Sequence, residues 1–175
     1  MQRFTLDTTF NTDIKTLEKA MDDISLDDYV AERLKSVKSR TTIERREDGP
    51  MLVRRIKCIP AAEIPKGAKK FVPEEATYWI EEIKWDRANH RLEFSVANDF
   101  FKDKFKSKGL YSWSERDGKV HRHIEFELTI KFRVAMVNVG PIVEKFIVPR
   151  VKASLEEEVG ILKEFLKEKY GVANP

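Results

Sequence analysis

The sequence contains one cysteine, three histidines, and no glycine-rich phosphate loop. A lone cysteine, Cys58, excludes an internal disulfide and a thiolate-rich metal site. Neither a G-x-G-x-x-G nor a Walker pattern occurs, which disfavours nucleotide hydrolysis and cofactor-dependent redox chemistry. No apolar run approaches the ~20 residues of a membrane span, and the opening residues lack the apolar stretch of a signal peptide. We therefore expect a soluble, cytoplasmic protein without a cofactor.

The charges are numerous but balanced, with 33 basic against 30 acidic side chains in 175 residues. A net charge of +3 is too small a share of these to indicate a nucleic-acid partner. The length suits one hydrophobic core, since domains of roughly 100–150 residues are commonest. We expect a single domain over 1–175 and a monomer.

The hydrophobic pattern changes period twice along the chain. Residues 4–10 alternate between apolar and polar, which predicts a half-buried strand, and two short helices are expected at 14–21 and 26–37. From 38 to 134 the period is two, and three turn signals divide this stretch into hairpins. These signals are Asp48-Gly49, Asp86-Arg87-Ala88-Asn89 and Asp117-Gly118.

After Gly140-Pro141 the period becomes helical, with an apolar stripe from Val143 to Leu166. Such a helix buries its stripe most simply across the concave face of a curled sheet. The predicted fold is therefore α+β, with a curled antiparallel sheet of about seven strands around a long C-terminal helix. Two short helices follow the first strand, and a cavity is expected between sheet and helix.

This order of elements resembles the START-like superfamily (SRPBCC), the helix-grip fold of the birch-pollen allergen and of steroidogenic lipid-transfer domains. The resemblance rests on the alternating strand Phe4–Phe10, the two short helices, and the junction Gly140-Pro141 that opens the long helix. It is strongest to uncharacterised bacterial branches. It implies binding of hydrophobic or amphiphilic ligands, while a minority of such proteins are enzymes. No catalytic residue is carried over, because these families share no common catalytic motif.

Hairpin register predicts which side chains face the interior. A two-residue turn at Asp117-Gly118 places Trp113 opposite Arg122 and Tyr111 opposite Ile124. In the middle hairpin, Trp79, Glu81, Ile83 and Trp85 should share a face with Leu92, Phe94 and Val96. In the first hairpin, Ile43 and Arg45 should share a face with Leu52, Arg54, Ile56 and Cys58.

A binding site follows from these faces. Arg54 and Arg122 are candidates to orient an anionic head group, because buried arginines need a partner. Alternatively, Arg54, Arg122, Glu81 and Glu115 are rim residues or mutually paired structural charges. The candidate apolar contacts are Trp79, Trp85, Phe94, Tyr111, Trp113, Phe126, Leu128, Val151 and Leu155. The predicted function is binding, transport or sensing of a hydrophobic small molecule such as a lipid.

Two alternatives stay open. A cyclase or dehydratase of the same fold would use Glu81 as its base, although binding is favoured over catalysis. An adaptor without a cavity would act through two basic-aromatic loops, 66–72 and 98–108. These loops could also contact an anionic membrane surface transiently, or their phenylalanines could simply complete the core while the lysines reach water. Nucleic-acid binding by them is disfavoured.

The pattern His121, His123, Glu125 and Glu127 has the spacing of a metal site on one strand face. That face is opposite Ile124 and Phe126, so we expect it to be the solvated outside and predict no metal. Cys58 shares the face of Leu52 and Ile56 and is expected to be a buried, unreactive thiol.

Overall fold

The computed structural model describes residues 1–61, 78–97, 104–131, 133–134, 137–138 and 140–175. The helices are α1 (Ile14–Asp22), α2 (Ser25–Arg33) and α4 (Gly140–Tyr170). The main strands are β1 (Gln2–Phe10), β2 (Val37–Asp48), β3 (Met51–Pro60), β4 (Trp79–Asp86), β5 (Arg91–Ala97), β6 (Phe105–Arg116) and β7 (Lys119–Ile130). A short ribbon of β8 (Arg133–Val134) and β9 (Val137–Asn138) precedes α4.

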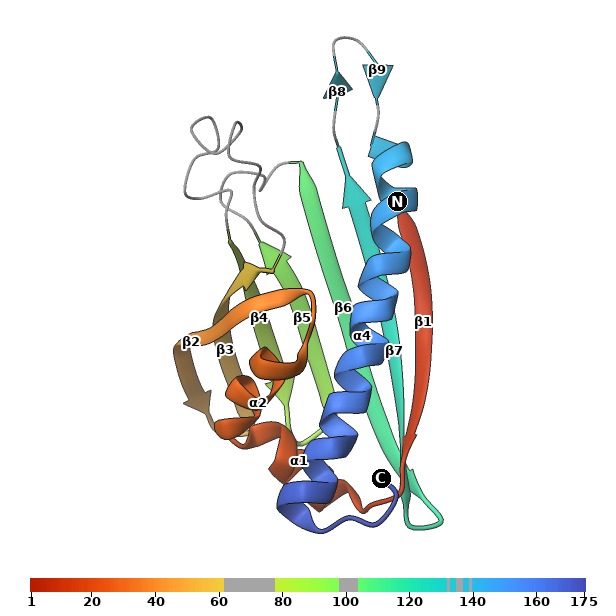
Figure 1. Ribbon diagram of the computed structural model, residues 1–175. Helices are drawn as coiled ribbons and strands as arrows, with labels where there is room; N and C mark the ends of the chain where they lie inside the picture. The colour runs from red at the N-terminus through yellow and green to blue at the C-terminus, as the bar shows by residue number, and fades with distance from the viewer. Residues whose placement is uncertain (62–77, 98–103, 132, 135–136, 139) are drawn as a thin grey trace.

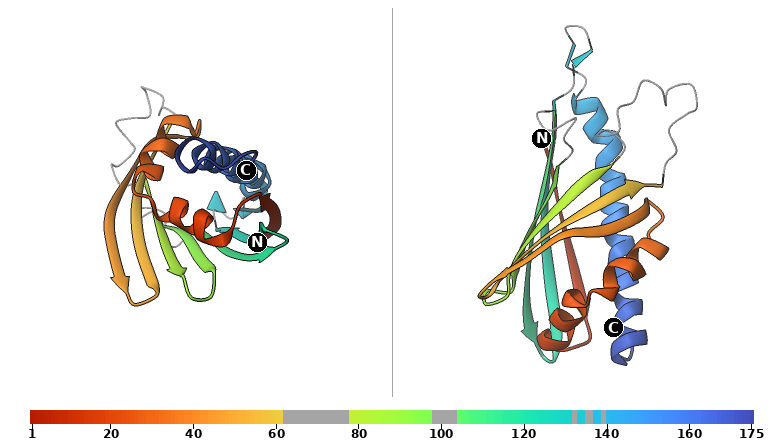
Figure 2. Two further views of the ribbon diagram at one scale, coloured as in Figure 1. Left: turned by 90° about the horizontal axis from the view of Figure 1, so that it is seen from below. Right: turned by 90° about the vertical axis from the view of Figure 1, so that its left-hand side faces the viewer.

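Seven strands form one antiparallel sheet in the order β1-β7-β6-β5-β4-β3-β2. The first strand therefore closes the sheet beside the last long strand, and α4 crosses the concave face (Figure 1). The sheet curls around α4, and α1 and α2 lie across the same side of the sheet (Figure 2). The predicted helix-grip architecture is confirmed.

The β6–β7 hairpin has the predicted register, with Trp113 opposite Arg122 and Tyr111 opposite Ile124. Its turn residues Asp117 and Gly118 both have positive φ, 52° and 68°, as a type I′ turn requires. The predicted faces of the middle hairpin are also confirmed, since Ile83 pairs with Phe94 and Trp85 with Leu92 in β4 and β5. Local turn chemistry was therefore a reliable guide to the interior.

The first hairpin departs from the prediction because β2 contains a bulge between Thr42 and Glu44. The extra residue reverses the alternation on one side of the bulge. Ile43, predicted to face inward, is 50% exposed, while Arg40 and Thr42 take the inward positions opposite Cys58 and Ile56. Arg45 keeps its place opposite Arg54.

Three element boundaries also differ. The second helix ends at Arg33, and Val37, expected at its end, begins β2. β6 begins at Phe105, so 105–108 belong to a strand and not to a loop. β7 ends at Ile130 and is not continuous with 133–134.

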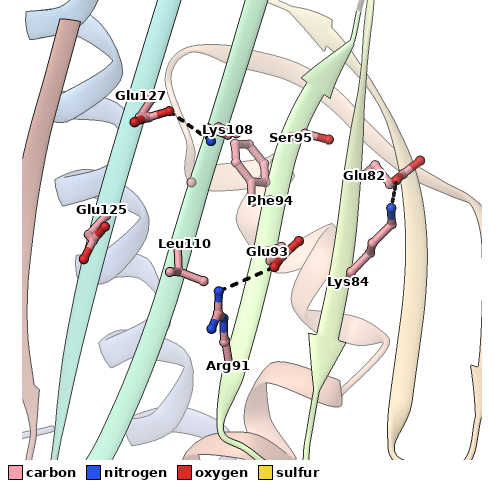
Figure 3. Close-up of a pocket in the computed structure, with 11 residues that line it drawn as sticks. Glu82, Lys84, Arg91, Glu93, Phe94, Ser95, Lys108, Leu110, Glu125 and Glu127 are labelled. Atoms are coloured by element: carbon pink, nitrogen blue, oxygen red, sulfur yellow. Dashed lines mark ion pairs between the residues drawn. The ribbon is translucent and has the colours of Figure 1, made fainter.

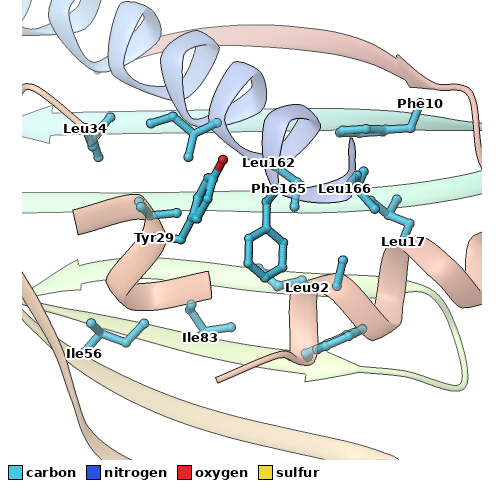
Figure 4. Packing of buried hydrophobic residues seen from close by; sticks show 14 of the residues in the cluster. Phe10, Leu17, Tyr29, Leu34, Ile56, Ile83, Leu92, Leu162, Phe165 and Leu166 are labelled. Carbon is cyan, nitrogen blue, oxygen red and sulfur yellow. The ribbon is translucent and has the colours of Figure 1, made fainter. Parts of the chain in front are cut away.

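The largest hydrophobic core lies between α1, α2, the C-terminal part of α4 and the sheet (Figure 4). Phe10, Leu17, Phe165 and Leu166 are fully buried there. Asp13 caps α1, because its side chain accepts a hydrogen bond from the backbone N–H of Thr16 at 2.9 Å. A second, smaller cluster joins Phe126, Leu128 and Ile130 to Leu155 of α4.

Candidate functional site

A pocket of about 480 Å³ lies between the sheet and the middle of α4. This volume is within the range of roughly 300–1,000 Å³ that is usual for small-molecule sites. The lining residues come from the segment between α2 and β2, from strands β2 and β4–β7, from Lys104 just before β6, and from α4. They are Leu34, Ser36, Val37, Arg40, Trp79, Glu81, Phe94, Val96, Lys104, Phe105, Ser107, Phe126, Ile130, Val151, Ser154, Leu155 and Glu158.

Aromatic and aliphatic side chains form most of its wall. Phe126 stacks on Phe4 of β1 with ring centroids 4.9 Å apart, and Phe94 meets Tyr111 edge to face at 6.3 Å. Gly109 allows this packing, because a Cβ atom there would lie 3.3 Å from the Tyr111 ring and 3.5 Å from the Phe126 ring. These walls favour an apolar ligand body.

One end of the pocket is polar. The Arg40 side chain is 8% exposed, and its Nη2 lies 3.0 Å from Glu81 Oε2. The other Glu81 oxygen, Oε1, accepts a hydrogen bond from Trp79 Nε1 at 3.1 Å. Arg40 also lies 3.7 Å from Glu158 and 3.8 Å from Asp27. Burial alone would lower the pKa of Arg40, but these three carboxylates outweigh it and raise the pKa.

The Arg54 guanidinium is bonded to other side chains of the protein. Its Nη2 donates to Asp27 of α2 and, at 3.2 Å, to the hydroxyl of Thr42. Thr42 in turn donates to the same carboxylate at 2.7 Å. Of the three alternatives for Arg54, the structural ion pair is the one that this geometry favours.

A smaller cavity of about 90 Å³ adjoins the pocket, since Arg40, Phe94 and Glu158 line both. Arg54, Trp85, Tyr111 and Arg122 also line this cavity. Burial lowers the pKa of Arg122, but an arginine side chain still keeps its charge at neutral pH. Burial raises the pKa of Tyr111, so its phenol stays neutral.

The predicted contact residues thus separate into three groups. Trp79, Glu81, Phe94, Phe126, Val151 and Leu155 line the larger pocket. Arg54, Trp85, Phe94, Tyr111 and Arg122 line the smaller cavity. Trp113 and Leu128 line neither: Leu128 is fully buried, and Trp113 packs on Trp85 and donates to Glu18 at 3.0 Å. Glu115 accepts from the backbone N–H of Ile14 at 2.9 Å, which is a structural role.

Several lining residues were missed from the sequence, among them Arg40, Phe105 and Ser107. Arg40 was missed because the bulge in β2 shifts its face. Phe105 and Ser107 were assigned to a loop, although the alternation of β6 could have been extended back from Tyr111 to both. Phe105 is half-buried in the pocket while Lys106 and Lys108 are exposed, so this part of the basic-aromatic segment is a strand with lysines directed to water. Residues 66–72 and 98–103 lie outside the described residues.

The convex face of the sheet has a hollow of about 340 Å³, and most of the charged side chains that line it are paired with one another (Figure 3). Lys84 lies 3.0 Å from Glu82, and Lys108 lies 3.0 Å from Glu127. Side chains on a solvated face commonly form such pairs, so this hollow is a weaker candidate than the apolar pocket.

The His-x-His pattern lies on this outer face, as predicted. His121 Nδ1 is 3.2 Å from the Thr9 hydroxyl, and His123 Nδ1 is 2.6 Å from Asp7, both on β1. Across the described ranges no group of three or more His, Cys, Asp and Glu side chains converges as metal ligands would. Cys58 is buried, and burial raises the pKa of its thiol, which makes it a poor nucleophile.

Comparison with known proteins places the chain in a family. Residues 5–166 match the family described as a protein of unknown function (DUF2505). The chain belongs to the DUF2505 family. No curated protein matches this DUF2505 chain in sequence. In the part of the chain that the structure describes, none of the helices combines the length and the apolar character needed to cross a membrane.

Solved structures share the fold of this DUF2505 protein over nearly its whole length. The Zhui aromatase/cyclase from Streptomyces sp. R1128 superposes with a TM-score of 0.67 at 12% identity, covering 98% of this chain and 99% of that chain. TTHA0849 from Thermus thermophilus gives 0.66 at 15% identity, covering 94% and 97%. A START superfamily protein from Mycobacterium smegmatis gives 0.56 at 13% identity, covering 95% and 97%. The resemblance to the START-like superfamily is confirmed at the level of fold.

Proposed function

We propose that this DUF2505 protein binds a hydrophobic or amphiphilic small molecule, such as a lipid, in the pocket between the sheet and α4. The observation that carries the proposal is a pocket of about 480 Å³ with apolar walls and a polar end formed by Arg40 and Glu81. Each 100 Å² of apolar ligand surface removed from water contributes roughly 2.5 kcal/mol to binding. The START-like fold supports the same function, because proteins of this fold bind hydrophobic ligands.

A substitution that fills the pocket tests this proposal. Val151 lines the pocket, whereas Ala153, two residues along α4, is exposed. We expect Val151→Trp to weaken binding of the neutral fluorescent probe N-phenyl-1-naphthylamine at least tenfold, and Ala153→Trp to leave it unchanged. Equal probe affinities for both variants and the unsubstituted protein would rule out this pocket as the binding site.

The identity of the natural ligand can be sought directly. Mass spectrometry of an organic extract from the purified, denatured protein would identify a bound lipid or aromatic metabolite. An unrelated protein purified in parallel is the control. A ligand present in stoichiometric amount in this extract alone supports a carrier or sensor. An extract without a ligand favours the enzyme and adaptor alternatives.

An enzyme is the second candidate, because Glu81 lies in the pocket wall where a base would be needed. One of the structurally similar proteins is an aromatase/cyclase. Against this, Trp79 donates a hydrogen bond to one oxygen of the Glu81 carboxylate, and Arg40 forms an ion pair with the other. Incubating the extracted ligand with the protein separates the two: an unchanged mass supports binding alone, and a product lost with Glu81→Gln supports catalysis.

The adaptor alternative is less favoured, since the pocket exceeds the roughly 300 Å³ below which a ligand site is unusual.

We further propose that the protein acts as a cytoplasmic monomer that contacts an anionic membrane surface transiently when it exchanges its ligand. Lys104 lines the pocket, and Lys106 and Lys108 are exposed on the neighbouring part of β6, where Lys108 also pairs with Glu127 at 3.0 Å. Clustered lysines are attracted to anionic lipid surfaces. Co-sedimentation with vesicles that contain phosphatidylserine, and none with neutral phosphatidylcholine vesicles, is the expected result. Equal sedimentation with both vesicle types would contradict it.

A further inference from the structure

Arg122 is a buried arginine without a carboxylate partner. It is 7% exposed, on β7, and its guanidinium lies 5.0 Å from the Phe10 ring and 5.7 Å from the Tyr111 ring. Among the described residues, no carboxylate lies within 4.0 Å of it, and its Nε is buried without a hydrogen-bond partner. An unpaired buried charge is costly, so a position that keeps one calls for a partner from outside the chain.

The Nε atoms of the other two interior arginines of the described ranges also lack a hydrogen-bond partner, but both of these arginines have carboxylate partners. Arg40 lies close to Glu81, Glu158 and Asp27, and Arg54 is bonded to Asp27. These two arginines therefore already pair with the nearby carboxylates, and the charge of Arg122 has no carboxylate partner.

The empty space beside Arg122 suits a small anion. The cavity of about 90 Å³ has room for roughly three water molecules, which is also the scale of a carboxylate group. Three arginines and two carboxylates, Asp27 and Glu158, contribute to its lining, and Glu81 pairs with Arg40 from beside it, so Arg122 is the guanidinium in this wall that has no carboxylate partner. The Tyr111 hydroxyl, which burial keeps neutral, is a further hydrogen-bond donor in this wall.

We propose that the ligand carries one carboxylate, which pairs with Arg122 in the smaller cavity while its apolar body fills the larger pocket. This inference rests on the proposed function, because it assumes that the larger pocket holds a ligand. The two spaces share Phe94, Arg40 and Glu158 in their walls, so one molecule can occupy both. A planar carboxylate matches the fork of a guanidinium with two parallel hydrogen bonds. The small volume and the single guanidinium without a carboxylate partner favour it over a doubly charged phosphate ester.

Glu158 provides a second test residue of opposite sign. Its side chain is 41% exposed and lines both spaces, so its negative charge stands near the path of an entering anion. Removing this charge should strengthen anion binding, whereas removing Arg122 should weaken it. A merely structural role for either residue would affect acids and neutral ligands alike.

The experiment measures displacement of N-phenyl-1-naphthylamine from the full chain by two matched pairs at pH 7.5. The pairs are decanoate with 1-decanol and 2-naphthoate with 2-naphthol. For the unsubstituted protein, the acid of at least one pair should bind at least tenfold more tightly than its neutral partner. Arg122→Met should lose this preference while its affinity for the neutral partner stays within twofold. Glu158→Gln should increase the preference at least twofold.

The thermal unfolding midpoint checks that Arg122→Met folds, and Arg122→Lys, which keeps the charge, should retain part of the preference. Equal binding of acids and neutral partners by the unsubstituted protein would overturn the carboxylate inference and leave the proposed function intact. A preference for the acid that is unchanged in Arg122→Met would also overturn the carboxylate inference and leave the proposed function intact. Failure of all four compounds and of the probe to bind would overturn the proposed function together with the inference.

Discussion

Arg40 and Glu81 lie on strands separated by β3, yet Arg40 Nη2 and Glu81 Oε2 are 3.0 Å apart above the buried thiol of Cys58. The pair crosses the interior face of the sheet where the pocket becomes polar. It has two functions at once, since it holds the edge strand β2 to the sheet and presents a charged surface to the pocket.

Loss of one member of this pair should be strongly destabilising. Arg40→Met leaves Glu81 buried beside an apolar group, and breaking a buried pair in this way costs about 3–5 kcal/mol. Arg46→Met, an exposed position on the same strand, should change the free energy of unfolding by less than about 0.5 kcal/mol. Urea unfolding measures both. Similar stabilities for the two variants would show that the Arg40 pair contributes nothing to the fold.

The sequence predicted the hairpins well where turn chemistry determines the backbone. Asp117 and Gly118 both adopt positive φ, and their turn sets the register that brings Arg122 opposite Trp113. By contrast, no local signal marks the bulge at Thr42–Glu44, because a bulge depends on how β2 twists against β3. Because of this one extra residue, strict alternation along β2 does not place Arg40 on the inward face.

The candidate site was predicted in part for the same reason. Side chains on regular alternating strands, such as Phe94 and Phe126, could be assigned to the interior, and both line the pocket. Which interior residues border empty space could not be predicted, because this depends on the distance between α4 and the sheet. Trp113, for example, is an interior residue, but it packs against Trp85 and donates to Glu18 and does not line the pocket.

Asp22 should make the fold sensitive to acid. The last residue of α1 joins two hairpins, since its carboxylate lies 2.8 Å from Arg45 and 2.8 Å from Arg87. Burial alone would raise the pKa of Asp22, but the two guanidinium groups outweigh it and lower the pKa. A lowered pKa gives stability that is present above the unfolded value of 3.8 and is lost as the pH falls through the folded value.

Asp22→Asn should therefore reduce the free energy of unfolding by about 1 kcal/mol at pH 7, a value discounted because the pair is partly exposed. The difference from the unsubstituted protein should shrink as the pH falls below about 4. Asp48→Asn, exposed on the first hairpin, is the matched control. A difference that persists undiminished at pH 2.5 would contradict the assignment.

Two glycines of the C-terminal helix region should respond to alanine with opposite signs. Gly160 lies inside α4, and a Cβ atom added there would meet nothing within 4 Å, so Gly160→Ala should stabilise the protein by up to about 1 kcal/mol. Gly171 follows the helix with φ +67°, a conformation that alanine disfavours, so Gly171→Ala should destabilise by about 1 kcal/mol. Thermal unfolding of both variants measures the signs. Shifts in the same direction would contradict the backbone argument.

Tyr170, the last residue of α4, should produce a loss of stability in alkali. Its hydroxyl donates to Asp23 Oδ2 at 2.9 Å, and the Lys19 carbonyl lies 3.2 Å away. Burial, followed by the hydrogen bond to Asp23, raises the pKa of Tyr170 to about 12. A raised pKa means that the stabilisation is complete below the unfolded value of 10 and is lost as the pH rises through 12.

Tyr170→Phe should accordingly cost about 1 kcal/mol at pH 8, where the hydrogen bond is intact. The deficit relative to the unsubstituted protein should close between pH 10 and 12, because ionisation removes the same hydrogen bond from the unsubstituted protein. Urea unfolding at pH 8, 10 and 12 measures the difference. Tyr29 and Tyr111 also have raised pKa values. Because the variant and the unsubstituted protein both contain these two residues, their effect on stability cancels in the difference. A deficit that stays constant across this range would assign the alkaline loss to other groups.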